Sequence, residues 1–187
     1  MSNTGKSSGE NNDKFLSARE RKIAIIVSDW HKEITGLLLD GAVKTLIKYG
    51  ANNDDIIIRH VPGSFELISA AHMVVYNLAV DAVICIGCIV KGETDHYNYI
   101  CQGVTQGLAQ LNVDADVPVI YCILTTNTVQ QAMERAGGKY GNKGEDAAIT
   151  ALKMADLSDE LFILGESQNI EDLGFDDDID YYDEGLN

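Results

Sequence analysis

The sequence predicts an α/β fold, a three-layer αβα sandwich around a four-stranded parallel sheet. Four apolar runs are each long enough for a strand, and segments with apolar residues at helical spacing separate them. The runs are continuous instead of alternating, which is typical of parallel strands that helices cover on both faces. With 187 residues, of which 45% are hydrophobic, the chain is long enough to bury one such core.

The first half of the chain contains two strand–helix pairs. Strands are expected at 22–27 and 56–61, and helices at 32–49 and 64–79. The apolar stripe of the first helix is formed by Ile34, Leu38, Ala42, Leu46 and Tyr49. Gly50 ends that helix, Pro62 stops the second strand, and Ser64 is the expected N-cap of the second helix.

The second half repeats this alternation and ends in helices. Strands are expected at 81–90 and 117–124, and helices at 95–111, near 127–136 and at 144–157. The apolar stripe of the third helix is formed by Tyr97, Ile100, Val104, Leu108 and Leu111. Thr126 or Asn127 is the expected N-cap of the helix near 127–136.

These strands and helices occupy residues 21–157, between two segments of different composition. Residues 1–20 are rich in Ser, Asn, Gly and charged residues, and we expect them to be disordered. Residues 158–187 form an acidic tail without Lys or Arg, which carries most of the net charge of −15. The acidity therefore says little about a site in the central domain.

Composition excludes several classes of partner. An acidic protein is repelled by phosphate backbones, so we expect no nucleic acid. No apolar run approaches the roughly 20 residues of a membrane helix, and the first twenty residues lack the apolar stretch of a signal peptide. We expect a cytoplasmic protein that does not bind membranes.

The four cysteines include one C-x-x-C pair, Cys85 and Cys88, which is compatible with a metal or redox site. The pair falls in an expected strand, where residues three apart point to opposite faces. No second cysteine pair or histidine cluster completes a zinc site. The pattern favours packed free thiols and no metal.

In parallel sheets, ligands bind beyond the carboxyl ends of the strands, here at 28–31, 62–66, 88–96 and 125–127. The third of these loops opens a helix, whose first N–H groups attract anions. Gly92 allows close approach, Thr94 adds a hydroxyl, and His96 adds an imidazole, the side chain best suited to proton transfer at physiological pH. The alternative is a helix cap with a surface histidine. Neither the P-loop nor the dinucleotide-binding glycine pattern occurs.

Other candidates follow the first two strands. Glu66 is suited to accept hydrogen bonds from a polyol, and Phe65 to stack on a flat ring; alternatively, Phe65 packs in the core and Glu66 compensates the helix dipole. Trp30 is either a lid over a ligand or a core residue.

Arg135 and Lys143 lie far along the chain from these loops. Arg135 is either a bidentate phosphate ligand or an ordinary solvated charge on a helix. Lys143 lies in a glycine-rich turn, and its pattern likewise does not decide between a ligand-binding charge and a solvated one. His31, His60 and His72 have no evident partners and are expected to be structural or surface residues.

Four motifs, taken together, resemble the lumazine synthase family over Lys22 to Leu157. They are V-P-G-S-F-E at 61–66, G-x-x-x-K-G-E-T-D-H-Y at 87–97, T-T-x-x-x-x-Q-A-x-E-R-A-G at 125–137, and G-N-K-G at 141–144. Each is modest by itself, but their shared order and spacing are specific. The resemblance implies a flavodoxin-like fold.

The resemblance also implies roles for individual residues. The aminouracil and its ribityl chain would contact Trp30, Ser64, Phe65, Glu66, Ile89, Val90, Tyr121 and Lys143. The phosphate would be bound by Glu93 and Thr94, through their backbone amides, and by Arg135. His96 would transfer protons.

The implied reaction condenses 5-amino-6-(D-ribitylamino)uracil with 3,4-dihydroxy-2-butanone 4-phosphate, without a cofactor. Family members form homopentamers, sometimes a sixty-subunit icosahedral shell, and association with riboflavin synthase is a further expected partnership. The active site would lie between adjacent subunits, with Tyr121 contributed by the neighbour.

Three alternatives remain at this stage. They are a non-catalytic flavin or lumazine binder on the same scaffold, a cage protein whose acidic tail recruits basic partners, and a generic flavodoxin-like phosphate binder.

Overall fold

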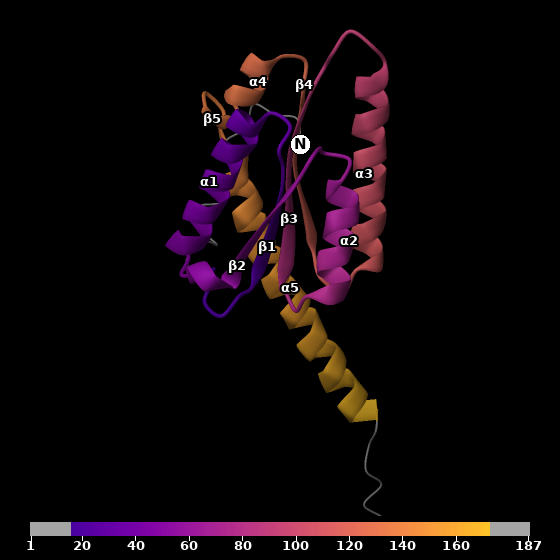
Figure 1. Ribbon diagram of the computed structural model, residues 1–187. Coiled ribbons are helices and arrows are strands. Elements are labelled where there is room, and N and C mark those ends of the chain that lie inside the picture. The colour runs from indigo at the N-terminus through magenta and orange to yellow at the C-terminus, as the bar shows by residue number, and fades with distance from the viewer. Residues whose placement is uncertain (1–15, 173–187) are drawn as a thin grey trace, which may run out of the picture.

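The computed structural model describes residues 16–172, and side chains up to Ser167. A four-stranded parallel sheet lies between two helical layers (Figure 1). The strands of this sheet are β1 (Ile23–Ser28), β2 (Ile56–Val61), β3 (Ala82–Val90) and β4 (Val119–Thr126). The helices are α1 (Lys32–Lys48), α2 (Leu67–Asn77), α3 (His96–Asp114), α4 (Val129–Met133) and α5 (Lys143–Asp172). Three short elements complete the fold: η2 (Asn53–Asp55), β5 (Ala136–Gly138) and β6 (Gly141–Asn142). The expected α/β sandwich is confirmed.

The strand order β2-β1-β3-β4 places the four carboxyl ends at one edge of the sheet. Ser28 pairs with Val61 and Val90 pairs with Thr126, so β1 ends level with β2 and β3 ends level with β4; Val27 pairs with Ile86, so β3 and β4 continue past the ends of the other two strands. The order changes direction between β1 and β3. The chain leaves β1 for α1 on one face and leaves β3 for α3 on the other, which is the arrangement that opens a binding crevice in such sheets.

Both faces of the sheet are buried, which explains the continuous apolar runs. Ile23, Ile25 and Val27 pack with α1 and α5, whereas Ala24 and Ile26 pack with α2 and α3. Cys85 and Cys88 lie in the two opposite core clusters as free thiols. Within residues 16–172, no group of His, Cys, Asp and Glu could hold a metal ion.

Three expectations about helix ends were wrong. Ser64 caps no helix, because α2 begins only at Leu67 after a turn. Thr128, and not Thr126 or Asn127, caps α4, since its side chain accepts a hydrogen bond from the Gln131 N–H. The helix expected near 127–136 is only α4, and the small β5–β6 hairpin follows it.

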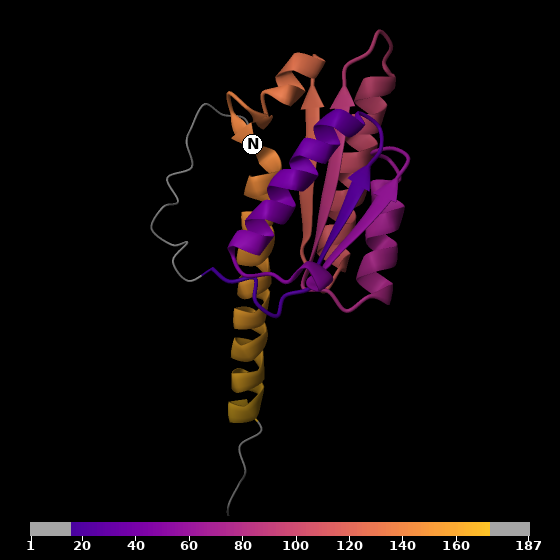
Figure 2. The ribbon, with the colours of Figure 1, turned by 60° about the vertical axis from the view of Figure 1, so that its left-hand side comes forward.

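The last helix also differs from expectation. α5 runs from Lys143 to Asp172, well past the expected end at 157, and its second half projects from the body of the molecule (Figures 1 and 2). Arg21 anchors it where it leaves, through ion pairs with Asp156 at 2.9 Å and Asp159 at 2.7 Å. None of the described helices is long and apolar enough to cross a membrane.

The segment expected to be a disordered head is partly packed. Ala18 is fully buried in the core, and its N–H donates to the Tyr49 carbonyl at 2.9 Å. Residues 1–15 of that segment, and residues 173–187 of the acidic tail, lie outside the described part of the chain.

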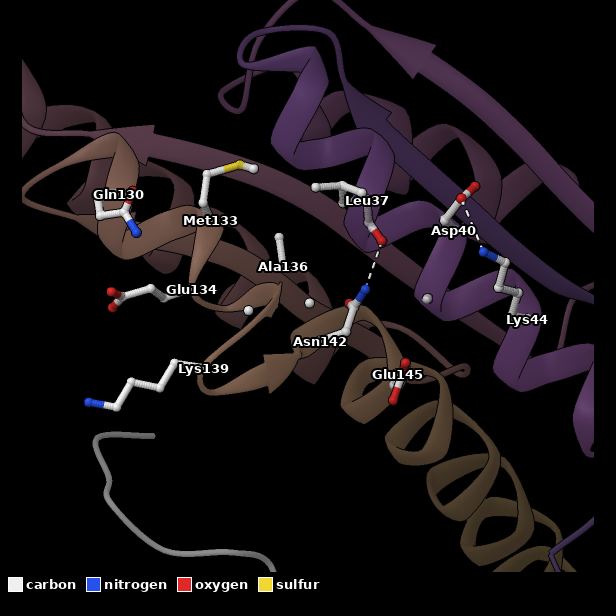
Figure 3. Close-up of a pocket in the computed structure, with 13 residues that line it drawn as sticks. Leu37, Asp40, Lys44, Gln130, Met133, Glu134, Ala136, Lys139, Asn142 and Glu145 are labelled. Atoms are coloured by element: carbon white, nitrogen blue, oxygen red, sulfur yellow. Dashed lines mark hydrogen bonds and ion pairs between the residues drawn. The ribbon is translucent and has the colours of Figure 1, made fainter.

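The G-N-K-G motif joins α5 to α1. The Asn142 side chain donates to the Leu37 carbonyl at 2.8 Å (Figure 3). It also accepts from the Gly144 N–H at 2.8 Å. Two glycines make room for this contact. A Cβ on Gly41 would lie 2.5 Å from the Asn142 side chain, and one on Gly144 would collide with the Leu38 carbonyl oxygen. This clamp positions α5, and the β5–β6 hairpin before it, against the sandwich.

Candidate active site

A cleft of about 550 Å³ opens at the carboxyl ends of the strands. Its walls come from the loops after β1, β2 and β3 and from the first turns of α3. The lining residues are Trp30, Gly63, Ser64, Phe65, Glu66, Cys88, Ile89, Val90, Gly92, Thr94, His96, Tyr97 and Ile100. Eight of the expected site residues therefore meet in one place, as the strand-end rule predicts.

Trp30 stands at the mouth of the cleft with 69% of its surface exposed, which excludes the core alternative. The backbone N–H of Trp30 donates to Ser28 Oγ at 3.3 Å. The next residue, His31, has a left-handed backbone with φ of 60° and begins α1. This sharp turn leaves the Trp30 ring outside the core, available to a ligand.

The floor of the cleft contains one unsatisfied hydroxyl. Ser64 is buried, and its Oγ finds no hydrogen-bond partner among the described residues. A Cβ on Gly87, in β3, would lie 2.8 Å from this oxygen, so the absence of a side chain at 87 makes space for it. A buried hydroxyl without a partner is costly, and a ligand hydroxyl in the cleft would satisfy it.

Phe65 and Glu66 face solvent from the same loop. The Phe65 ring is 51% exposed and lies against the backbone of α3, where a Cβ on Gly103 would come within 3.2 Å of it. Phe65 is therefore not a core residue. The Glu66 carboxylate is exposed and folds back over Gly63. Together they present an aromatic face and a hydrogen-bond acceptor to the cleft.

The far wall begins where β3 ends. The Lys91 N–H donates to the Thr126 carbonyl at 2.9 Å and holds this loop to β4. Gly92 and Thr94 line the cleft, and His96 is the first residue of α3, so its imidazole stands beside helix N–H groups that have no partner within the helix. Glu93 is exposed and is not among the lining residues.

Tyr97 lines the cleft, although the sequence pattern predicted it only as part of the apolar stripe of this helix and not as a site residue. It closes the motif at 87–97. Burial raises the pKa of its phenol, as does the nearby Cys101 thiol, whereas a hydrogen bond with Thr125 lowers it. The phenol is thus a neutral donor at neutral pH, set beside His96.

Tyr121, Arg135 and Lys143 do not reach this cleft within one chain. Tyr121 lies under α3, with its hydroxyl 3.2 Å from Thr105 Oγ1, and burial raises its pKa. Arg135 stacks over the Tyr140 ring at 4.8 Å and donates to the Gln131 carbonyl at 2.8 Å. Lys143 pairs with Asp146 at 2.6 Å.

A second hollow, of about 670 Å³, lies between α1 and the α4–β5–β6 segment, beside the backbone neighbours of Arg135 (Figure 3). Asp40 and Lys44 form an ion pair of 3.4 Å on one side, and Glu134 and Lys139 stand on the other. None of the residues expected to bind substrate lines it.

The remaining histidines have local partners. His60 Nδ1 lies 3.0 Å from Asp29, and His72 packs against Tyr76 with ring centroids 4.5 Å apart. Neither they nor His31 lines the cleft.

An αβα sandwich with such a cleft at its strand ends is a scaffold of enzymes that bind small polar molecules, here with two aromatic rings, a carboxylate and an imidazole around the ligand. The family model described as 6,7-dimethyl-8-ribityllumazine synthase matches residues 20–159. The chain belongs to this family.

Three relatives carry the name 6,7-dimethyl-8-ribityllumazine synthase. One from Bacteroides fragilis is 58% identical over 136 residues, which cover 73% of this chain and 95% of that protein. One from Porphyromonas gingivalis is 56% identical over 139 residues, covering 74% and 86%. One from Phocaeicola vulgatus is 52% identical over 145 residues, covering 78% and 86%.

Proposed function

We propose that this chain catalyses a step of riboflavin biosynthesis, the condensation of 5-amino-6-(D-ribitylamino)uracil with 3,4-dihydroxy-2-butanone 4-phosphate to give 6,7-dimethyl-8-ribityllumazine, phosphate and two waters. The names of its relatives support the reaction. The observation that carries it is the cleft in which exposed Trp30 and Phe65 rings, the unsatisfied Ser64 hydroxyl, the Glu66 carboxylate and His96 face one space.

The cleft offers a matching group for each part of the aminouracil. Trp30, which is mostly exposed, is free to stack on the pyrimidine ring. Ser64 and Glu66 are placed to bond the ribityl hydroxyls, since one lacks a partner and the other is a charged acceptor. The backbone at Ile89 and Val90, where β3 ends, is the proposed contact to the uracil edge.

The phosphate of the second substrate belongs at the start of α3. The backbone amides near Glu93 and Thr94 precede the positive end of a long helix, and such ends attract anions. We assign Arg135 to the same phosphate, but from a neighbouring copy, because within one chain its guanidinium is held by Gln131 and Tyr140 away from the cleft. Lys143 and Tyr121 are assigned to the neighbour's contribution for the same reason.

The reaction proceeds by proton transfers that His96 can mediate. The primary amine of the aminouracil attacks the ketone, and loss of water gives an imine that joins the two substrates. Phosphate is eliminated, the second amine closes the ring, and another water leaves. His96 would take and return protons at the imine and elimination steps, an effect of about 10²–10⁴-fold. Holding two small reactants together supplies more, with proximity effects of roughly 7–11 kcal/mol.

A site shared between copies requires an oligomer, and the proposal includes a homopentamer that can assemble into a sixty-subunit shell. The family resemblance suggests both, and riboflavin synthase as a further partner. Large exposed apolar side chains on α2 and α3, Met73, Tyr76 and Tyr99, support an interface on that side. A cytoplasmic location is supported by four free cysteines, since reducing compartments keep thiols unpaired.

A turnover assay with the purified protein and both substrates, followed by lumazine absorbance, tests the function. We expect product from the wild type and, for Arg135→Ala, a much higher KM for the phosphate substrate. If folded and assembled protein gives no product above the uncatalysed background, the enzyme function is excluded, and the non-catalytic binder and the cage protein remain. Nothing in the cleft favours those alternatives, since His96 and the ribityl-binding groups are all present.

A further inference from the structure

The second half of α5 is a helix without a covering surface in its own chain. It extends beyond the body of the molecule in both views (Figures 1 and 2), and the family match ends at residue 159. Arg21 holds the helix at Asp156 and Asp159, the last such ion pair along it among the described residues. Every residue from Ser158 to Ser167 is exposed.

This exposed segment contains a turn that is apolar on all sides. Leu161, Phe162, Ile163 and Leu164 are exposed by 59%, 67%, 62% and 49%. Four consecutive helical residues point in directions about 100° apart, so together they surround the helix axis. A helix that is apolar all round is normally buried, but these side chains contribute no core packing to this chain.

An apolar stripe leads from the body to this turn. Met154 and Leu157, exposed by 39% and 41%, precede Leu161 and Leu164 at spacings of three and four. The buried face of α5, which includes Ala151, Leu152 and Ala155, is directed at the sandwich instead. Anchors at i, i+4 and i+7, here Leu157, Leu161 and Leu164, are those by which a helix binds in a groove.

The charged side chains next to the turn are acidic. They are Glu160 and Glu166, since Asp159 is already held by Arg21 at 2.7 Å, and the sequence has no Lys or Arg from Ser158 onward. A complementary surface therefore carries cations around an apolar groove. Nucleic acid and anionic lipid are repelled by this charge, and helices that bind membrane surfaces have basic polar faces.

We propose that residues 157–167 of α5 form a docking helix for a partner protein with an apolar groove rimmed by Lys and Arg. A second copy of this helix is the less favourable occupant. Side by side, two copies would bring Glu160 and Glu166 of each close to the same residues of the other. The stripe from Met154 to Leu164 also spans about two heptads, fewer than the three or four of a stable coiled coil.

Gly165 provides an adjustable element in this helix. A Cβ there meets nothing within 4 Å, so alanine fits without collision. Glycine weakens helices relative to alanine, so the free docking helix frays more easily than the same helix with alanine at position 165 would. Gly165→Ala should tighten partner binding by at most about fivefold, the effect of a single glycine on helix formation, and by less the more fully the free helix is formed.

The test uses the full-length protein and a fluorescent synthetic peptide of 18 residues, built from Leu and Lys so that one helical face is apolar and the other basic. A scrambled peptide of the same composition controls for charge alone. Fluorescence anisotropy at physiological salt should give micromolar binding for the amphipathic peptide and at least tenfold weaker binding for the scrambled one.

Variants locate the contact. Leu161→Ala combined with Leu164→Ala should weaken peptide binding at least tenfold. Ile47→Ala, which trims an exposed apolar side chain on α1, should leave binding unchanged. Turnover should be unchanged in both, because none of these residues lines the cleft, so failure here is distinguishable from failure of the proposed enzyme function.

Five results would overturn the proposal. Three concern the peptide: no binding of the amphipathic peptide, equal binding of the scrambled peptide, or unchanged binding after the Leu161/Leu164 double substitution. The fourth is binding to vesicles of phosphatidylcholine, with or without phosphatidylserine, that the double substitution abolishes. The fifth is a change in the sedimentation coefficient of the peptide-free double variant, which would identify a second copy as the occupant.

Discussion

Ser64 and Gly87 illustrate how single residues shape the cleft. The hydroxyl of Ser64 is buried without a partner, and it fits only because position 87 has no side chain. An unsatisfied buried hydroxyl lowers the stability of the fold, so selection for stability alone would not retain Ser64. A ligand that bonds to this hydroxyl at the floor of the cleft explains its presence.

Gly87→Ala should therefore impair both stability and binding. The new Cβ would lie 2.8 Å from Ser64 Oγ, 3.1 Å from Leu67 Cδ1 and 3.3 Å from Ile123 Cγ1, in a close-packed strand. Overpacking of this kind costs roughly 1–3 kcal/mol, measurable by urea unfolding, and displacing Ser64 should raise the KM for the aminouracil. Gly36→Ala, on α1 with open space around its Cα, should instead stabilise by about 0.5–1 kcal/mol. Equal effects of the two substitutions would contradict the close contact at Gly87.

Buried thiols predict a loss of stability at alkaline pH. Burial raises the pKa of Cys85 and Cys122 to about 12 and that of Cys88 to about 11, from an ordinary value of 9.0. In the unfolded chain these thiols ionise at lower pH than in the folded one, so their contribution is complete below about pH 8.

The free energy of unfolding should accordingly decrease as pH rises from about 9 toward 11, by roughly 1 kcal/mol per pH unit for each fully buried thiol. Urea titrations over this range measure the slope. Cys122→Val should flatten it, whereas Cys101→Val, at a partly exposed site, should have a smaller effect. A slope that is unaffected by Cys122→Val would assign the pH dependence to other groups.

At the scale of elements, Asn142 determines how α5 joins the sandwich. Its amide links the Leu37 carbonyl in α1 to the Gly144 N–H at the start of α5. The glycines at 41 and 144 are needed because the two helices and this side chain meet at very short range. The G-N-K-G motif is thus explained as much by helix packing as by the lysine within it.

Asn142→Ala should destabilise the fold by about 1–3 kcal/mol, because it removes two hydrogen bonds and leaves the Gly144 N–H and the Leu37 carbonyl without this partner. Thermal unfolding measures the loss as a lower Tm. Gln106→Ala, an exposed polar residue on α3, should change the Tm little. An unchanged Tm for Asn142→Ala would mean that water replaces the amide at no cost.

At the scale of the whole molecule, the cleft and the proposed phosphate ligand Arg135 are separate features of one chain. The residues of the cleft follow β1, β2 and β3, whereas Arg135 follows α4, where Gln131 and Tyr140 hold it. If Arg135 binds the phosphate as we propose, a complete site depends on how copies of the chain are arranged.

Mixed oligomers should reveal this sharing. At a concentration of the phosphate substrate far below the raised KM of Arg135→Ala, that variant and Glu66→Ala are each expected to be nearly inactive. Subunits of the two refolded together should regain about a quarter of wild-type activity, because random mixing pairs two intact contributions at one site in four. Co-refolded Glu66→Ala and His96→Ala should not recover, because both residues line the cleft of the same chain. No recovery in the first mixture, with co-assembly shown by mass, would place Arg135 outside the shared site.

Local patterns predicted much of this protein correctly. The apolar runs identified β1 to β4 because strands covered on both faces carry few polar residues; β2, at the edge of the sheet, keeps the exposed Arg59 and His60. The helical stripes identified α1 and α3. Residues after the strand ends met in one cleft because parallel strands carry their carboxyl ends to one edge. The sequence motifs, and not these patterns, carried the expected family, which the comparisons confirm.

The sequence alone determined the layers of the fold, the position of the cleft and most of the residues that line it, because these follow from local periodicity and from the geometry of a parallel sheet. Only the tertiary structure decided that Trp30 and Phe65 face the cleft, that Ser64 is buried without a partner, and that α5 continues past residue 157 with an uncovered apolar turn. Exposure and hydrogen bonding depend on what lies opposite a side chain across the fold, and no local pattern contains that information.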